Sequence, residues 1–109
     1  RMTPPQDRRF EPRSAAAARA VVIGPGLELP CQIVDQSAAG LRLKLDRKFA
    51  LPDRVLVIDM GRATAIEAEV VWRKGLEAGL KQRGQASLRG LVPSRFAPAR
   101  AAFLRAGGR

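Results

Sequence analysis

Two groups of side chains in this chain could bind a phosphate-bearing ligand, and a predicted strand, turn and strand separate them. The first group is Arg8, Arg9 and Arg13, near the N-terminus. Each guanidinium offers a planar fork of donors that matches phosphate oxygens or the O6 and N7 edge of guanine. Residues 1–13 also contain three prolines, so we expect a flexible, extended arm. The alternative is a solvated tail. Without other evidence this alternative is favoured, because arginines a few residues apart arise readily by chance in an arginine-rich chain.

The second group is Asp35, Ser37 and Gly40, which break an otherwise strand-like stretch. A carboxylate can accept hydrogen bonds from the ring N–H and amino group of guanine, and a hydroxyl can bond a base or a phosphate. Gly40 permits backbone geometry that a Cβ would forbid. The residues by themselves leave a second interpretation open, in which Asp35 and Ser37 bond their own backbone in a turn.

Three further residues are weaker candidates. Arg42 and Lys44 follow the break and could contact phosphate, but their alternation with leucines favours exposed strand charges. Trp72 could stack on a guanine base. Its place in line with Ile66, Ala68 and Val70 instead favours a core position.

The composition narrows the class of protein. With 109 residues, of which 46% are hydrophobic, the chain is long enough for one folded domain. The formal net charge of +10 favours anionic partners, or else reflects a solubilising surface. The chain has no histidine and a single cysteine, Cys31, which we expect to be a buried thiol without an activating base. We therefore expect no catalytic residues, no metal site and no enzyme.

The elements that must position these residues are short strands followed by one helix. No apolar run approaches the roughly 20 residues of a membrane-spanning helix, so we expect no membrane insertion. We expect a cytoplasmic location. Pro98 suits the first turn of the expected helix, and Gly107-Gly108 ends it. One side of the helix is expected to carry Phe96, Ala99, Phe103 and Leu104. A loop is expected over Arg83–Gly90. The strands are expected near Arg19–Ile23, Leu29–Asp35, Leu41–Asp46, Arg54–Met60, Thr64–Arg73 and Leu80–Gln82.

Taken together, the motifs are more specific than either alone. Arg9-x-x-x-Arg13, followed by Asp35-x-Ser37-x-x-Gly40 after a strand, turn and strand, resembles the PilZ domain family, bacterial receptors for the second messenger cyclic di-GMP. The later segment Val70–Arg73 looks like the penultimate strand of that family. The resemblance extends from about Asp7 to the C-terminal helix.

The resemblance implies an all-β fold, a six-stranded antiparallel β-barrel with a C-terminal α-helix. Residues 1–13 would form the arginine-rich arm and residues 14–109 the barrel and helix of a single domain. The arm arginines would wrap around phosphates and guanine edges, while Asp35, Ser37 and Gly40 would line a base-binding surface. An additional arginine before the first motif accompanies an intercalated ligand dimer in the family; Arg8 fits that pattern and implies two ligand molecules per chain.

We interpret the chain as a sensor in which the ligand orders the arm and changes a surface for a protein partner, whose identity the sequence does not give. One alternative is a PilZ-like adaptor that binds a protein but no nucleotide, although such members tend to have lost these motifs. The other is a small basic barrel for single-stranded nucleic acid. Such a barrel needs aromatic stacking platforms, whereas this chain has 5% aromatic residues and no tyrosine, so we expect no specific nucleic-acid binding.

Overall fold

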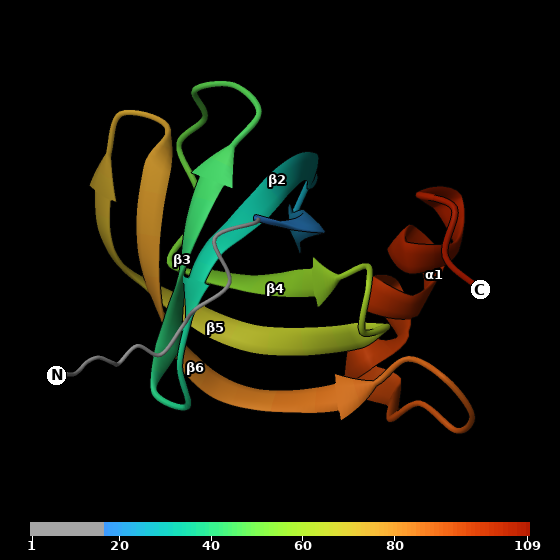
Figure 1. Ribbon diagram of the computed structural model, residues 1–109. Coiled ribbons are helices and arrows are strands. Elements are labelled where there is room, and N and C mark those ends of the chain that lie inside the picture. Colours follow the sequence, from blue (N-terminus) through green and yellow to red (C-terminus); the bar gives the residue numbers. More distant parts are fainter. Residues whose placement is uncertain (1–16) are drawn as a thin grey trace, which may run out of the picture.

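A computed structural model describes residues 17–109 and contains six antiparallel strands in a closed barrel, in the order β1-β2-β3-β6-β5-β4, followed by a helix (Figure 1). This confirms the predicted fold. The arm expected at residues 1–13 lies outside the described residues. The elements are β1 (Ala18–Gly24), β2 (Leu27–Gln36), β3 (Gly40–Leu45), β4 (Arg54–Asp59), β5 (Thr64–Lys74), β6 (Glu77–Ser87), a 3-10 turn at Ser94–Phe96 and α1 (Ala97–Arg105).

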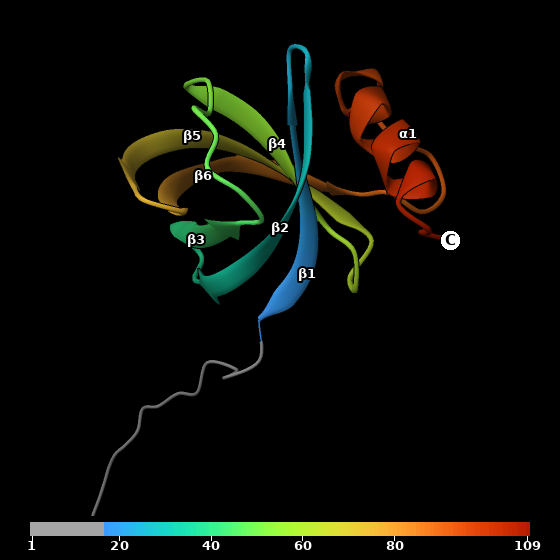
Figure 2. The ribbon, with the colours of Figure 1, turned by 90° about the horizontal axis from the view of Figure 1, so that it is seen from above.

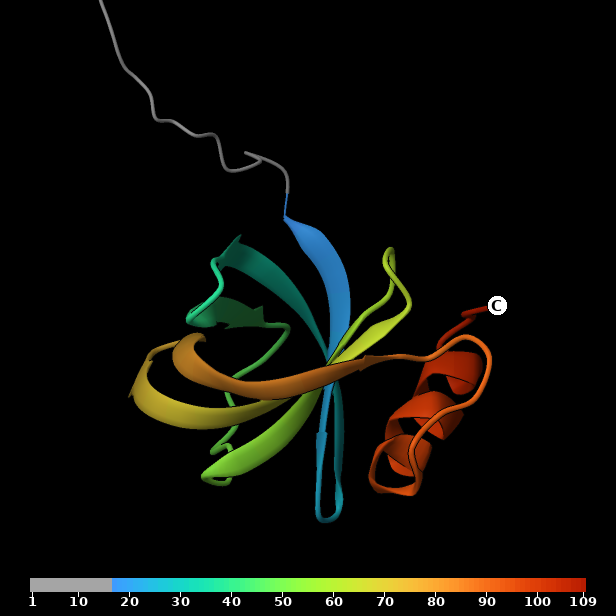
Figure 3. The same cartoon turned by 90° about the horizontal axis from the view of Figure 1, so that it is seen from below.

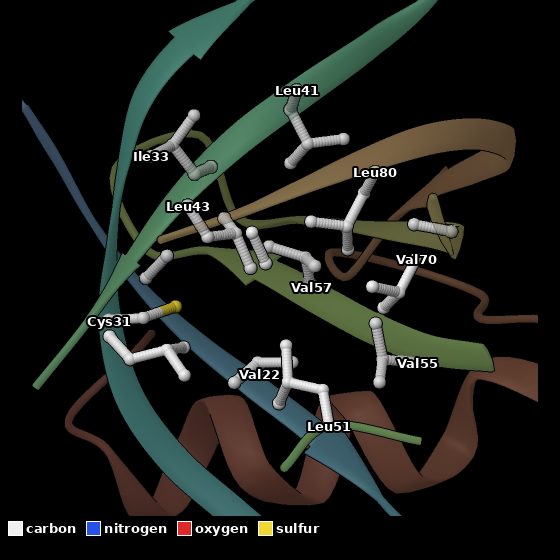
Figure 4. Close-up of a cluster of buried hydrophobic side chains, with 14 of the residues drawn as sticks. Val22, Cys31, Ile33, Leu41, Leu43, Leu51, Val55, Val57, Val70 and Leu80 are labelled. Carbon is white, nitrogen blue, oxygen red and sulfur yellow. The ribbon is translucent and has the colours of Figure 1, made fainter. Parts of the chain in front are cut away.

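The barrel is filled by side chains that alternate inward along each strand, as a two-residue period requires. In β2 the buried residues are Leu27, Leu29, Cys31 and Ile33, and they meet inward-facing residues of β3 and β4 (Figure 4). The Cys31 thiol is buried among them, as predicted. Burial raises the pKa of this thiol to about 12, so it stays protonated and unreactive at neutral pH.

The helix packs against the outside of the barrel and closes a second apolar cluster. One face of β1 points into the barrel and the other faces α1, so Val21 and Ile23 are buried as well as the inward-facing Val22. Phe96 and Phe103 fill the space between helix and strands. Figures 2 and 3 show α1 on one side of the barrel and the β5–β6 turn on the opposite side. The outer surface near that turn is therefore left uncovered by α1.

Two expectations about the C-terminal part were wrong. Arg83–Gly90 was expected as a loop, but β6 continues to Ser87 because it pairs with β5 over almost its whole length, from Lys74↔Glu77 to Thr64↔Ser87. That partner, rather than the polar local sequence, decides the backbone conformation. Leu104 was expected on the packed side of the helix, but it is 52% exposed and Ala102 packs in its place.

Within the described part of the chain, no helix has the length and apolar character needed to cross a bilayer.

Candidate ligand-binding site

The Asp35, Ser37 and Gly40 motif lies where β2 turns into β3. The backbone N–H of Ser37 donates to the carbonyl oxygen of Gly40 over 2.8 Å and closes the turn. The Ser37 Oγ accepts a hydrogen bond of 3.3 Å from the N–H of Ala39, which is the local bonding that the turn interpretation predicted. The hydroxyl proton can still be donated to a ligand, so the turn orients Ser37 without exhausting it.

Gly40 is required by a close approach between two strands. A Cβ on Gly40 would overlap the carbonyl oxygen of Leu80 in the neighbouring β6. The same junction carries a hydrogen bond of 3.0 Å from the N–H of Gln82 to the carbonyl of Ala39. The predicted need for glycine is thus correct. Its cause is the approach of β6, since Gly40 is not among the glycines with a positive φ.

A β-bulge turns Asp35 out of the barrel. Cys31 and Ile33 point into the core, so unbroken alternation would send Asp35 inward as well. The register of β2 against β3 shifts between Ile33 and Asp35, and the extra residue reverses the alternation. Asp35 therefore pairs with Arg42 and lines an outer surface.

A second bulge does the same for Trp72 and overturns the expected core position. Val70 packs inside the barrel, and the register of β5 against β6 shifts between Val70 and Trp72. As a result both Val71 and Trp72 lie on the outer surface, 58% and 43% exposed. The single tryptophan of the chain is thereby available to a ligand.

The two bulges bring four residues into one line across four strands. Asp35 pairs with Arg42, Arg42 with Gly79, and Gly79 with Trp72. We call this set the outer row. Together with Ser37 and Gly40 it lines a hollow of about 350 Å³, which we call the motif cavity. That volume is within the range of small-ligand sites, and its lining combines a carboxylate, a hydroxyl, a guanidinium and an indole.

Arg42 is held at this site by a neighbouring carboxylate. Its Nη1 donates to Oε1 of Glu77 over 3.0 Å, and both side chains are partly exposed. Arg42 thus places a positive charge on the lining of the motif cavity. Lys44 is an exposed strand residue, two positions farther along β3, and lines a different hollow with Arg19 and Gln32.

Two other hollows lack the predicted motif residues that carry ligand chemistry. The first, of about 480 Å³, lies between β4 and α1 and is lined mainly by apolar groups. Its Arg95 is near Glu67, at 3.8 Å, and also stacks on the Phe96 ring. The second, of about 530 Å³, contains Lys44 but neither Asp35 nor Ser37. The motif cavity is therefore the candidate site.

The described structure brings Asp35, Ser37, Gly40, Arg42 and Trp72 together. Arg8, Arg9 and Arg13 lie outside the described residues.

Sequence reasoning missed two residues that shape this site, Gly79 and Glu77. Gly79 stands directly opposite Trp72, and Glu77 holds Arg42. The sequence favours a turn over Gly75–Gly79, whereas both residues stand on β6, which begins at Glu77 and returns beside Trp72.

Comparison with protein families gives a match to the PilZ domain over residues 7–91. The match therefore includes both motifs and most of the barrel. Comparison with curated proteins returned no match, and comparison with solved structures returned none either. Since the family match covers more than half of the chain and the barrel agrees with it, this chain belongs to the PilZ domain family, a family of cyclic di-GMP receptors that are binding domains rather than enzymes.

Proposed function

We propose that this chain is a cytoplasmic sensor that binds cyclic di-GMP in the motif cavity. The observation that carries the proposal is that Asp35, Ser37 and Gly40, far from Trp72 in the sequence, share one hollow with it on the outer surface of the barrel. This surface is on the side away from α1 (Figure 2). A ligand there could be reached by a segment that precedes β1.

The chemistry of the cavity fits the two halves of the ligand, its guanine bases and its phosphodiesters. The Asp35 carboxylate can accept from the N1–H and amino group of guanine, and the Ser37 hydroxyl can donate to a base or a phosphate. Arg42 supplies a guanidinium for a phosphate oxygen. Trp72 offers an exposed aromatic surface for a purine ring.

Arg8, Arg9 and Arg13 complete the site in this proposal. Their guanidiniums would close over the ligand, with Arg9 and Arg13 on phosphates and guanine edges. Arg8 would recruit a second, intercalated ligand molecule. Since a ligand can shift a conformational equilibrium only by contacting one state better than the other, these arm contacts are what would couple binding to arm order.

The ordered arm would then present a changed surface to a protein partner. The function proposed is that of a switchable binding domain: the ligand is bound and released without chemical change.

The test is a calorimetric titration of the purified chain with cyclic di-GMP, with GTP and a short single-stranded oligonucleotide as controls. Saturable binding of cyclic di-GMP alone supports the receptor, and a stoichiometry near two supports the role of Arg8. No binding of cyclic di-GMP refutes the proposal and favours the nucleotide-free adaptor. Salt-sensitive binding of the oligonucleotide instead would favour the nucleic-acid barrel.

A further inference from the structure

The indole of Trp72 lies directly across Gly79. The two residues are cross-strand partners in β5 and β6. A Cβ built on Gly79 would overlap three atoms of the indole, Nε1, Cε2 and Cδ1. No other residue type could therefore stand at position 79 without moving the ring. Gly79 itself is buried, which is consistent with the indole covering its outer side.

This placement gives the indole one covered side and one open side. The covered side rests on the Gly79 backbone, and the side chain as a whole remains 43% exposed. The open side belongs to the motif cavity, whose lining also includes Gly79 and Arg42. Arg42 and Trp72 are the neighbours of Gly79 on its two sides in the outer row. The indole therefore takes the space that a side chain at 79 would need, next to Arg42 in the outer row.

We propose that Gly79 is a positioning residue that holds Trp72 flat as a stacking platform for a purine base. The identity of the base as guanine rests on the proposed function above, whereas the position of the indole does not. In this arrangement a base stacks on the open side of Trp72, while Arg42 lies beside it, within reach of a phosphate. Neither residue has to be rearranged when the ligand enters, so the platform is present before binding.

The alternative role for such a pair is purely structural, because an aromatic ring laid over a strand glycine also shields the backbone. The two roles differ in what a substitution changes. A structural pair affects stability alone. A platform also affects affinity, and base–aromatic stacking predicts a loss of about 5- to 150-fold when it is removed.

The experiment compares Gly79→Ala with Gly84→Ala, a matched control on the same strand where a new Cβ meets only ordinary contacts, the nearest at 3.5 Å from Glu67. Trp72 is the only tryptophan, so its fluorescence and near-ultraviolet circular dichroism report its position without any ligand. In Gly79→Ala we expect emission at longer wavelength, a loss of the aromatic dichroism and weaker cyclic di-GMP binding. Gly84→Ala should match the wild type in all three. Unchanged spectra and affinity in Gly79→Ala would overturn the proposal.

Two more variants separate stacking from simple apolar contact. Trp72→Phe keeps an aromatic ring and should retain part of the affinity, whereas Trp72→Leu should lose it by the factor given above. Equal binding by both would overturn the stacking role. The double variant Gly79→Ala with Trp72→Ala should bind no more weakly than Trp72→Ala alone, because the glycine acts only through the ring.

If Gly79→Ala unfolds, the double variant, which lacks the overlapping ring, should melt at a higher temperature than Gly79→Ala. A melting temperature as low as that of Gly79→Ala would overturn the positioning role. If wild-type chain binds no cyclic di-GMP, the proposed function and the guanine platform fail together. The ligand-free spectra then still decide whether Gly79 positions Trp72.

Discussion

Arg42 and Glu77 form a salt bridge of 3.0 Å between β3 and β6, beside the motif cavity. Arg42 lines that cavity, whereas Glu77 does not. A carboxylate so close to the guanidinium orients it, but it also lowers the positive potential that an entering phosphate meets. Arg42 is therefore expected to raise the affinity for an anionic ligand, and Glu77 to lower it.

Replacing Glu77 by Gln should strengthen cyclic di-GMP binding. The variant removes a negative charge near the phosphate position and retains a side chain that can accept a hydrogen bond from Arg42. A single charge–charge interaction at the surface is worth about 1 kcal/mol, which corresponds to about fivefold in affinity. Calorimetry at low and high salt measures the gain, which should shrink at high salt.

Glu69→Gln is the control for this prediction. Glu69 forms a comparable salt bridge of 3.0 Å with Arg83 and does not line the motif cavity. It changes the net charge by the same amount, so its affinity should stay close to that of the wild type. Equal gains in both variants would mean that overall charge, and not the Arg42–Glu77 pair, governs binding.

Arg9→Ala and Arg13→Ala should each weaken cyclic di-GMP binding by about tenfold or more. Hydrogen bonds to charged groups are worth about 1.5–3 kcal/mol, and each arginine is expected to supply at least one. Titration calorimetry of the two variants beside wild type gives the loss. Binding of equal strength by all three proteins would remove the arm from the site.

Arg8→Ala should change the stoichiometry more than the affinity for the first ligand. If Arg8 holds the second molecule of an intercalated dimer, the variant should bind one ligand per chain where the wild type binds two. Calorimetry gives the stoichiometry directly, and the mass of the complex by native mass spectrometry provides a second measurement. A wild-type stoichiometry of one would refute this role.

Gly40→Ala should destabilise the barrel at the start of β3. The added Cβ would overlap the Leu80 carbonyl oxygen, which is backbone and cannot rotate away. Overpacking of this kind costs about 1–3 kcal/mol, and thermal unfolding would show it as a lower melting temperature. Gly61→Ala is the control, because its nearest new contact is at 3.7 Å. Equal melting temperatures for the two variants would contradict the close approach.

The buried thiol should make stability fall in alkaline solution. Burial raises the pKa of Cys31 from 9.0 to about 12, so the native state keeps its proton where the unfolded state loses it. The contribution is fully present below pH 9 and is lost as the pH rises towards 12, with a slope of up to about 1.4 kcal/mol per pH unit. Urea unfolding at pH 8, 9 and 10 measures the decline.

Cys31→Ala lacks this ionisation and controls for all the other groups that titrate. The stability difference between wild type and variant should narrow as the pH rises. A constant difference across this pH range would show that the thiol ionises alike in both states.

Much of the barrel could be predicted because its strands carry local signals. Leu41, Leu43 and Leu45 alternate with charged residues, and all three are buried in the structure. The extent of β6 could not be predicted this way. Its segment beyond Gln82 is polar and contains a glycine, and it is a strand only because β5 pairs with it.

The chemical groups that this protein carries, and most of the breaks between its strands, can be recognised in the sequence alone: the arginine and Asp-x-Ser-x-x-Gly motifs and the two-residue period of the strands. The direction in which Asp35 and Trp72 point depends instead on how the strands pair. Alternation predicts both inside the barrel, and a bulge in each strand turns both outward. A bulge arises from the register between two paired strands, and that register is a property of the pair which neither strand encodes alone.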